Sequence, residues 1–215
     1  MTGYIANPLI NLVIMLLIVI GGIGFLTWDD FCTNKWNLKR YRLQSKIILV
    51  TTAVLILLPA IFFFLSDFAG FSMGKRILAS LFQSVTLRTA GFNTADLGAM
   101  NDSSKAIMTL MMLIGGSPGS TAGGMKTTTI AVLILNAFAT FGREPETEVF
   151  GRRFDNTVVK NAATIAILYF FLFFTGGIAI SQIEHVALSD CLFETASAVG
   201  TAGLTFCLLY TSDAA

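Results

Sequence analysis

The stretch Gly115-Gly116-Ser117-Pro118-Gly119-Ser120-Thr121-Ala122-Gly123-Gly124-Met125-Lys126 interrupts the longest apolar run of the chain, which extends from about residue 106 to residue 141. One helix of that length would measure roughly 54 Å, well beyond the roughly 30 Å hydrocarbon core of a bilayer. Five glycines and one proline within ten positions also oppose a continuous helix. We therefore predict two half-helices joined by a loop near mid-depth in a membrane. Such a loop must face a wet cavity, to which we expect it to present the hydroxyl groups of Ser117, Ser120 and Thr121.

Composition places the rest of the chain in a membrane as well. Hydrophobic residues make up 54% of the 215 positions and charged residues 13%, about half the charged share of a soluble domain. Three further apolar stretches, residues 7–26, 47–65 and 158–180, approach the roughly 20 residues of a span. Two others, residues 77–87 and 186–199, are too short to cross and are predicted to enter the membrane and return. The net charge of +1 gives no indication of nucleic-acid binding.

Charge predicts the orientation. If the spans alternate, one side carries nine basic residues and the other carries Lys75, Arg76, Arg88 and Lys105. By the positive-inside rule the side with nine is cytoplasmic, so both short segments enter from outside. The first apolar run is long for the core of a signal peptide and lacks a preceding cationic region, so we interpret it as a span. The nine basic residues are Lys35, Lys39, Arg40, Arg42, Lys46, Arg143, Arg152, Arg153 and Lys160.

The two short apolar segments are each followed by Thr-Ala-Gly, which indicates an internal repeat. The copies are Arg88-Thr89-Ala90-Gly91-Phe92-Asn93 and Gly200-Thr201-Ala202-Gly203-Leu204-Thr205. Upstream of them, Leu81-Phe82-Gln83-Ser84 and Leu192-Phe193-Glu194-Thr195 correspond if a one-residue gap is allowed. Two copies of one unit in one chain predict a pseudo-symmetric assembly.

Thr-x-Gly after a short helix is typical of an ion filter made of backbone carbonyls. Glycine reaches positive φ without steric cost, so that neighbouring carbonyl groups can point to one axis and replace the hydration shell of K⁺. A single such glycine would be read as an ordinary turn residue, but two in matched positions favour a filter. The predicted filter residues are Thr89, Ala90, Gly91, Phe92, Thr201, Ala202, Gly203 and Leu204.

Four charged positions need separate interpretations. Lys126 is the basic residue expected inside the membrane, either as an electrostatic barrier to a cation or as a donor to carbonyl groups freed by the broken helix. Glu194 is predicted to accept hydrogen bonds that hold the second filter, and Arg88 to pack or pair at the outer vestibule. His185 beside Glu184 is predicted to form a polar pair at the membrane interface. Nothing resembles a catalytic triad or a metal cage, so no enzymatic activity is expected.

With these residues placed, the chain resembles the KtrB-type subunits of the TrkH/Trk/Ktr/HKT potassium transporter superfamily. The resemblance implies four span–pore helix–span repeats around one pore, with residues 115–124 and Lys126 as an intramembrane gating loop. It further implies multi-pass insertion in a bacterial plasma membrane, a homodimer, and a cytosolic ring of nucleotide-binding regulatory subunits. K⁺ is the expected transported ion and Na⁺ the candidate coupling ion, with no covalently bound cofactor. The segments that carry the resemblance are residues 21–25, 82–94, 115–129 and 193–204.

The resemblance also divides the chain. Residues 1–42 correspond to the end of a second repeat, residues 43–142 to a third, and residues 143–205 to a cytoplasmic linker and the first part of a fourth. Residues 206–215 fit the expected apolar helix poorly and are interpreted as an atypical, non-native tail.

Three other functional interpretations fit the sequence less well than an ion pathway. Gly119 and Gly124 have the spacing of a nucleotide phosphate loop, but Met125 occupies its lysine position and an apolar helix precedes it. A secondary transporter that binds a small solute at broken helices leaves the two matched Thr-Ala-Gly loops unexplained. A non-conducting membrane scaffold has no need of a glycine-rich break at mid-depth.

Overall fold

The computed structural model describes residues 5, 7–35, 37–143, 148–149, 152–153 and 155–206, and within them the chain is helical apart from one two-residue antiparallel ladder. The predicted all-α class is thereby confirmed. The elements are α1 (Pro8–Ile23), α2 (Phe25–Asn34), the 3₁₀ turn η2 (Leu38–Arg40), α3 (Leu43–Ser66), α4 (Met73–Thr86), α5 (Asp102–Leu113), α6 (Thr127–Phe141), β1 (Glu148–Val149), β2 (Arg152–Arg153), α7 (Asn156–Glu184) and α8 (Leu188–Val199).

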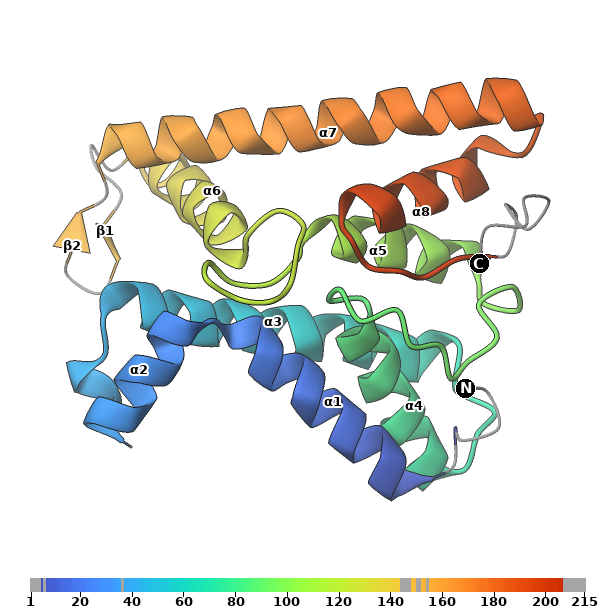
Figure 1. Cartoon of the computed structure of the whole chain (residues 1–215), viewed down its shortest axis with the longest axis horizontal. Helices are drawn as coiled ribbons and strands as arrows, with labels where there is room; N and C mark the ends of the chain where they lie inside the picture. Colours follow the sequence, from blue (N-terminus) through green and yellow to red (C-terminus); the bar gives the residue numbers. More distant parts are fainter. Residues whose placement is uncertain are drawn as a thin grey trace.

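Two continuous helices, α3 and α7, are long and apolar enough to cross a membrane. They run lengthwise through the molecule, with α7 along its upper edge in Figure 1. The third predicted run is broken as expected, because α5 and α6 are separated by residues 114–126. The two short segments form α4 and α8, which both end near the middle of the molecule (Figure 1).

The first predicted span ends earlier than the sequence indicated. Helix α1 stops at Ile23, and the chain then bends by 95° into α2, so that α1 and α2 together make at most one further span. The bend is at Gly24, whose φ of +92° lies in the region that favours glycine. Helix α2 was missed because residues 25–34 were interpreted as the end of a span and a linker.

The basic segments gather at one end of the molecule. The α2–α3 connection, the β1–β2 ladder and the start of α7 all lie at the left of Figure 1, away from the first turns of α4 and α8. This grouping agrees with the orientation expected from the positive-inside rule.

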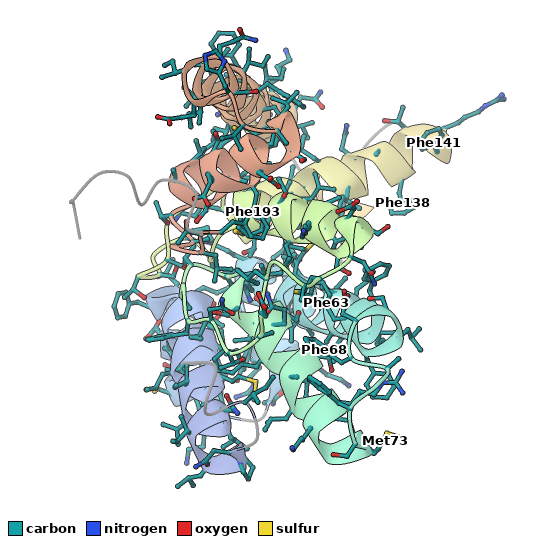
Figure 2. The ribbon with its side chains drawn as sticks, turned by 90° about the vertical axis from the view of Figure 1, so that its right-hand side faces the viewer. Phe63, Phe68, Met73, Phe138, Phe141 and Phe193 are labelled. Atoms are coloured by element: carbon teal, nitrogen blue, oxygen red, sulfur yellow. The ribbon has the colours of Figure 1, made fainter. Side chains whose placement is uncertain are left out.

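The core lies where α3, α4, α5 and α8 meet. Phe63, Met108 and Phe193 are almost fully buried there. Figure 2 shows Phe63, Phe68 and Phe193 inside the molecule, whereas Phe138 and Phe141 project from the far end of α6. The outward apolar side chains of α3 and α7 suit contact with lipid, because lipid tails are as apolar as the side chains themselves.

One carboxylate fastens the two ends of the segment that contains α4. Asp67, at the end of α3, accepts a hydrogen bond from the backbone N–H of Asn101 at 2.9 Å, and from the hydroxyl groups of Ser66 and Ser104. Helix α5 starts at Asp102. Asp67 therefore holds together the two ends of the segment that contains α4 and the loop after it.

Candidate ion pathway

The two short helices end in the same way, as the repeat predicts. After α4, the N–H of Ala90 lies 3.4 Å from the carbonyl oxygen of Thr86. After α8, the N–H of Ala202 lies 2.8 Å from the carbonyl oxygen of Ser197. The second loop is one residue longer than the first, which accounts for the gap between the two sequence copies.

Both Thr-Ala-Gly loops have an alternating backbone. Thr89 and Gly91 have φ of +59° and +70°, and Thr201 and Gly203 have φ of +56° and +79°. The alanine between them has a negative φ in each copy. Alternation of left- and right-handed residues turns successive carbonyl groups toward one side, as an ion filter requires. A β-branched residue at positive φ is a true outlier that costs about 1–3 kcal/mol and points to function.

The two loops are in contact. A Cβ atom placed on Gly91 would lie 2.9 Å from the carbonyl oxygens of both Ala202 and Gly203. One placed on Gly203 would lie 3.5 Å from the Cα atom of Gly91. Gly91 and Gly203 therefore lie side by side, in agreement with the pseudo-symmetric assembly that the repeat predicts. A hollow of about 480 Å³ opens beside Thr201 and Gly203.

Side chains of the short helices hold the outer part of each loop. Glu194 is buried, and its Oε1 accepts hydrogen bonds from the hydroxyl of Thr205 at 2.8 Å and from the N–H of Phe206 at 2.7 Å. This is the role predicted for Glu194. In the first copy, the hydroxyl of Thr86 donates to the carbonyl oxygen of Phe92 at 2.6 Å. The carbonyl oxygen of Phe92 is thus used in a hydrogen bond that stabilises the loop, which the sequence did not indicate.

The glycine-rich loop between α5 and α6 is folded back on itself. The N–H of Gly115 donates to the carbonyl of Met125 at 2.9 Å, and the N–H of Gly116 donates to that of Gly123 at 3.3 Å. The N–H of Thr127 in turn donates to the carbonyl of Gly116 at 3.1 Å. Backbone hydrogen bonds therefore hold a segment that its glycine content alone would leave loose.

One side of this loop lies directly against the second Thr-Ala-Gly loop. A Cβ atom on Gly123 would collide with the Oγ1 atom of Thr201, and one on Gly124 would lie 3.0 Å from the carbonyl oxygen of Gly200. Close approach of two backbones requires glycine here. The loop thus packs against the start of the second Thr-Ala-Gly loop.

The other side of the loop is seated on the corner between α1 and α2. The N–H of Ser117 donates to the carbonyl of Gly22 at 3.0 Å, and the N–H of Phe25 donates to that of Gly119 at 3.0 Å. A Cβ atom on Gly24 would lie 2.5 Å from the carbonyl oxygen of Pro118. This seat was missed, although the cluster Gly21-Gly22-Ile23-Gly24 signals that another backbone approaches closely.

The four polar residues predicted to be functional in this loop differ in their surroundings. Ser117 does not face a cavity: it is buried, and its hydroxyl lies 3.1 Å from that of Thr127. Thr121 is exposed, and the hydroxyl of Ser120 accepts a hydrogen bond from the N–H of Ala122. The Nζ of Lys126 donates to the carbonyl of Ala122 at 2.7 Å, the second of the two roles considered for it.

Arg88, for which packing or pairing at an outer vestibule is predicted, is packed inside the protein. It follows the inner end of α4 and is 7% exposed, and its Nε and Nη2 atoms have no hydrogen-bond partner among the described residues. Gly200 occupies the equivalent place in the second copy, where a Cβ atom would collide with the carbonyl oxygen of Met112. His185 lies at the opposite end of α7 from the basic segments and ends that helix with φ of +54°.

Comparisons with known proteins agree with this architecture. The family described as TrkH, cation transport protein, matches residues 1–209. The Ktr system potassium uptake protein B of Bacillus subtilis (strain 168) is 33% identical over 209 residues, which are 94% of this chain and 47% of that protein. The potassium/sodium uptake protein NtpJ of Enterococcus hirae is 33% identical over 208 residues, covering 93% of this chain and 46% of that protein.

A solved structure shares the fold. The crystal structure of the potassium transporter TrkH from Vibrio parahaemolyticus matches with a TM-score of 0.76 at 21% identity, over 94% of this chain and 45% of that chain. This chain spans about half the length of the curated relatives it matches. Their names describe ion uptake rather than an enzymatic reaction, in agreement with the expectation that the chain is not an enzyme.

Proposed function

Because the chain belongs to the TrkH family of cation transport proteins, we propose that it supplies two of the repeats that surround a K⁺ uptake pathway. The observation that carries the proposal is the contact between two Thr-Ala-Gly loops with the same alternation of φ. K⁺ is held by backbone carbonyl oxygens of residues 89–91 and 201–204, because the carbonyl oxygen of Phe92 accepts the hydrogen bond from Thr86. Each filter has one glycine, so discrimination against Na⁺ depends on few carbonyl positions.

The glycine-rich loop acts as the gate of this pathway. Its residues Gly123 and Gly124 lie against Thr201 and the carbonyl oxygen of Gly200, so its backbone blocks the inner end of the second filter. Its seat on the α1–α2 corner stabilises the blocking position. When the gate opens, the loop exchanges these contacts for others of similar free energy. Conformational switches commonly work in this way, by changing between two distinct packing arrangements. The charge of Lys126, bound to a carbonyl of the loop, adds repulsion to a passing cation.

The chain works within a larger assembly in the plasma membrane. We propose a homodimer regulated by a cytosolic ring of nucleotide-binding subunits, with Na⁺ as coupling ion. The names of the relatives support a multi-component system and the involvement of Na⁺, since they describe a Ktr system and potassium/sodium uptake. The end of the molecule that carries the basic segments would be the surface available to a cytosolic subunit (Figure 1).

The experiment that tests the function is ion flux through the complete transporter reconstituted in vesicles. We expect K⁺ uptake that saturates with K⁺ concentration and that Na⁺ replaces poorly as the transported ion. Uptake of an organic solute driven by an ion gradient, without net K⁺ conduction, would contradict the proposal.

A glycine pair in the corner tests the gate's seat. Gly24→Ala is expected to raise K⁺ flux roughly tenfold, because the methyl group meets the carbonyl oxygen of Pro118 at 2.5 Å and the left-handed backbone disfavours alanine by about 1–2 kcal/mol. Gly22→Ala is the matched control, since nothing lies within 4 Å of its Cβ position. Equal flux in both variants, at equal expression, would show that the corner does not control the loop.

A further inference from the structure

The carboxylate of Asp30 is a buried charged group that the proposed ion pathway does not use. Asp30 lies in the middle of α2 and is 3% exposed. Its Oδ2 atom accepts hydrogen bonds from the N–H of Arg42 at 3.0 Å and from the hydroxyl of Ser45 at 2.6 Å. Arg42 is the cap residue of α3, and Ser45 lies in the first turn of that helix. One carboxylate therefore joins α2 to the start of α3.

The neighbouring Asp29 makes a weaker attachment to the same place. Its side chain is 57% exposed, and its Oδ2 atom lies 2.8 Å from the Nη2 atom of Arg42. Exposed ion pairs contribute little to stability, because water and salt screen them. The hydrogen bonds of a buried carboxylate contribute more, since those to a charged group are about twice as strong as those between neutral groups. Asp30 rather than Asp29 therefore determines where α2 lies on α3.

The other end of α2 contacts the glycine-rich loop. Phe25, the first residue of α2, donates its N–H to the carbonyl of Gly119 at 3.0 Å. This donor is available to the loop because the first N–H groups of a helix have no partner within the helix. Phe25 and Asp30 are about 7.5 Å apart along the helix axis. A shift of α2 at Asp30 therefore also moves the N–H group that holds the loop.

We propose that Asp30 is a positioning residue of the gate. By fixing α2 on α3, its carboxylate keeps the N–H of Phe25 in place for Gly119 and so favours the blocking position of the loop. This inference rests on the proposed gate, and it adds a residue whose hydrogen-bond partners lie at the start of α3 rather than in the loop. The seat of the loop then has two supports, the close approach of Gly24 to Pro118 and the attachment of α2 at Asp30.

The test is K⁺ flux through the complete transporter in vesicles, measured for Asp30→Ala, Gly24→Ala and the double variant. Asp30→Ala should raise the maximal flux roughly tenfold, the factor that corresponds to one hydrogen bond to a charged group. The KM for K⁺ should stay unchanged, because the filter residues are not altered. Both substitutions release the same seat, so the double variant should show the flux of a single variant. Independent sites would instead give the product of the two factors, roughly a hundredfold.

Two further variants make the test specific. Asp29→Ala is the matched control, since it removes the adjacent carboxylate that also contacts Arg42, and it should leave the flux unchanged. Ser45→Ala removes one donor and retains the charge of Asp30, so it should raise the flux by a smaller factor, roughly threefold. This variant keeps the test decisive if Asp30→Ala expresses poorly.

The outcomes separate the role of Asp30 from the gate itself. A gain in flux in Gly24→Ala without any gain in Asp30→Ala or Ser45→Ala would retain the gate and exclude Asp30 as its positioning residue. Equal effects of Asp29→Ala and Asp30→Ala would exclude it as well, and so would a double variant that reaches the product of the two factors. If Asp30 only stabilised the fold, its substitution would lower flux and expression together. No gain in any of these variants would contradict the gate, and the role of Asp30 with it.

Discussion

A serine at position 91 is expected to raise the KM for K⁺ of the complete transporter about tenfold and to admit Na⁺. The new Cβ atom would lie 2.9 Å from the carbonyl oxygens of Ala202 and Gly203, and φ at this position is +70°. Strain of about 1–2 kcal/mol at positive φ corresponds to roughly a tenfold change in affinity. The measurement is K⁺ uptake against K⁺ concentration, with and without competing Na⁺.

Serine substitutions at two other glycines provide comparisons for Gly91→Ser. Gly203→Ser shares the positive φ but has more space, since its Cβ atom would be 3.5 Å from Gly91, so we expect a smaller rise in KM. Gly74→Ser lies in the first turn of α4 with nothing within 4 Å and should behave as the unmodified protein. Growth and K⁺/Na⁺ discrimination that remain normal in Gly91→Ser would remove residues 89–92 from the filter.

Deletion of residues 118–121 is expected to increase K⁺ flux by roughly 25-fold and to weaken control by a cytosolic regulator. The deletion removes the hydrogen bonds from Phe25 to Gly119 and from Thr121 to Gly21. At about 1 kcal/mol each, these bonds favour the blocking position by about 2 kcal/mol. The bonds of Gly115 and Gly116 at the base of the loop remain, so α5 and α6 keep their connection. Flux is measured in vesicles with the regulator present and absent.

Lys126→Gln serves as the comparison for the deletion. It removes the charge but leaves the backbone of the loop in place, so we expect a gain in flux well below that of the deletion. If the loop were a structural kink, the deletion would lower flux or abolish expression. A well-expressed deletion variant without any gain would therefore exclude the gate.

The sequence predicted the features that depend on local chemistry. The break after α5 follows from Pro118 and the surrounding glycines, and the two matched Thr-Ala-Gly loops follow from glycines after short apolar helices. Glu194 could be assigned because its partners lie only 11 and 12 residues away. These features need no knowledge of how distant segments meet.

The features that were missed depend on contacts between distant segments. The corner at Gly24 is set by the carbonyl of Pro118, 94 positions further along the chain. The sequence predicts that Ser117 faces a cavity, but its hydroxyl group forms a hydrogen bond with that of Thr127 across the loop. Arg88 is buried two residues after the end of α4, although a charged side chain is usually exposed to solvent. No periodicity in the sequence encodes such pairings.

The unlike residues at one equivalent position, Arg88 after α4 and Gly200 after α8, have a consequence for how such a protein can evolve. In a channel built from four identical subunits, any substitution beside the filter occurs in all four subunits. The smallest possible change in the charge around the filter is therefore four unit charges. Here the copies are separate segments of one chain, so they can differ in sequence. The first copy has the buried guanidinium group of Arg88, whereas the equivalent residue of the second copy, Gly200, has no side chain. The field on a cation can therefore be adjusted by a single unit charge, from one quadrant. Unequal copies give evolution a finer adjustment than rotational symmetry permits.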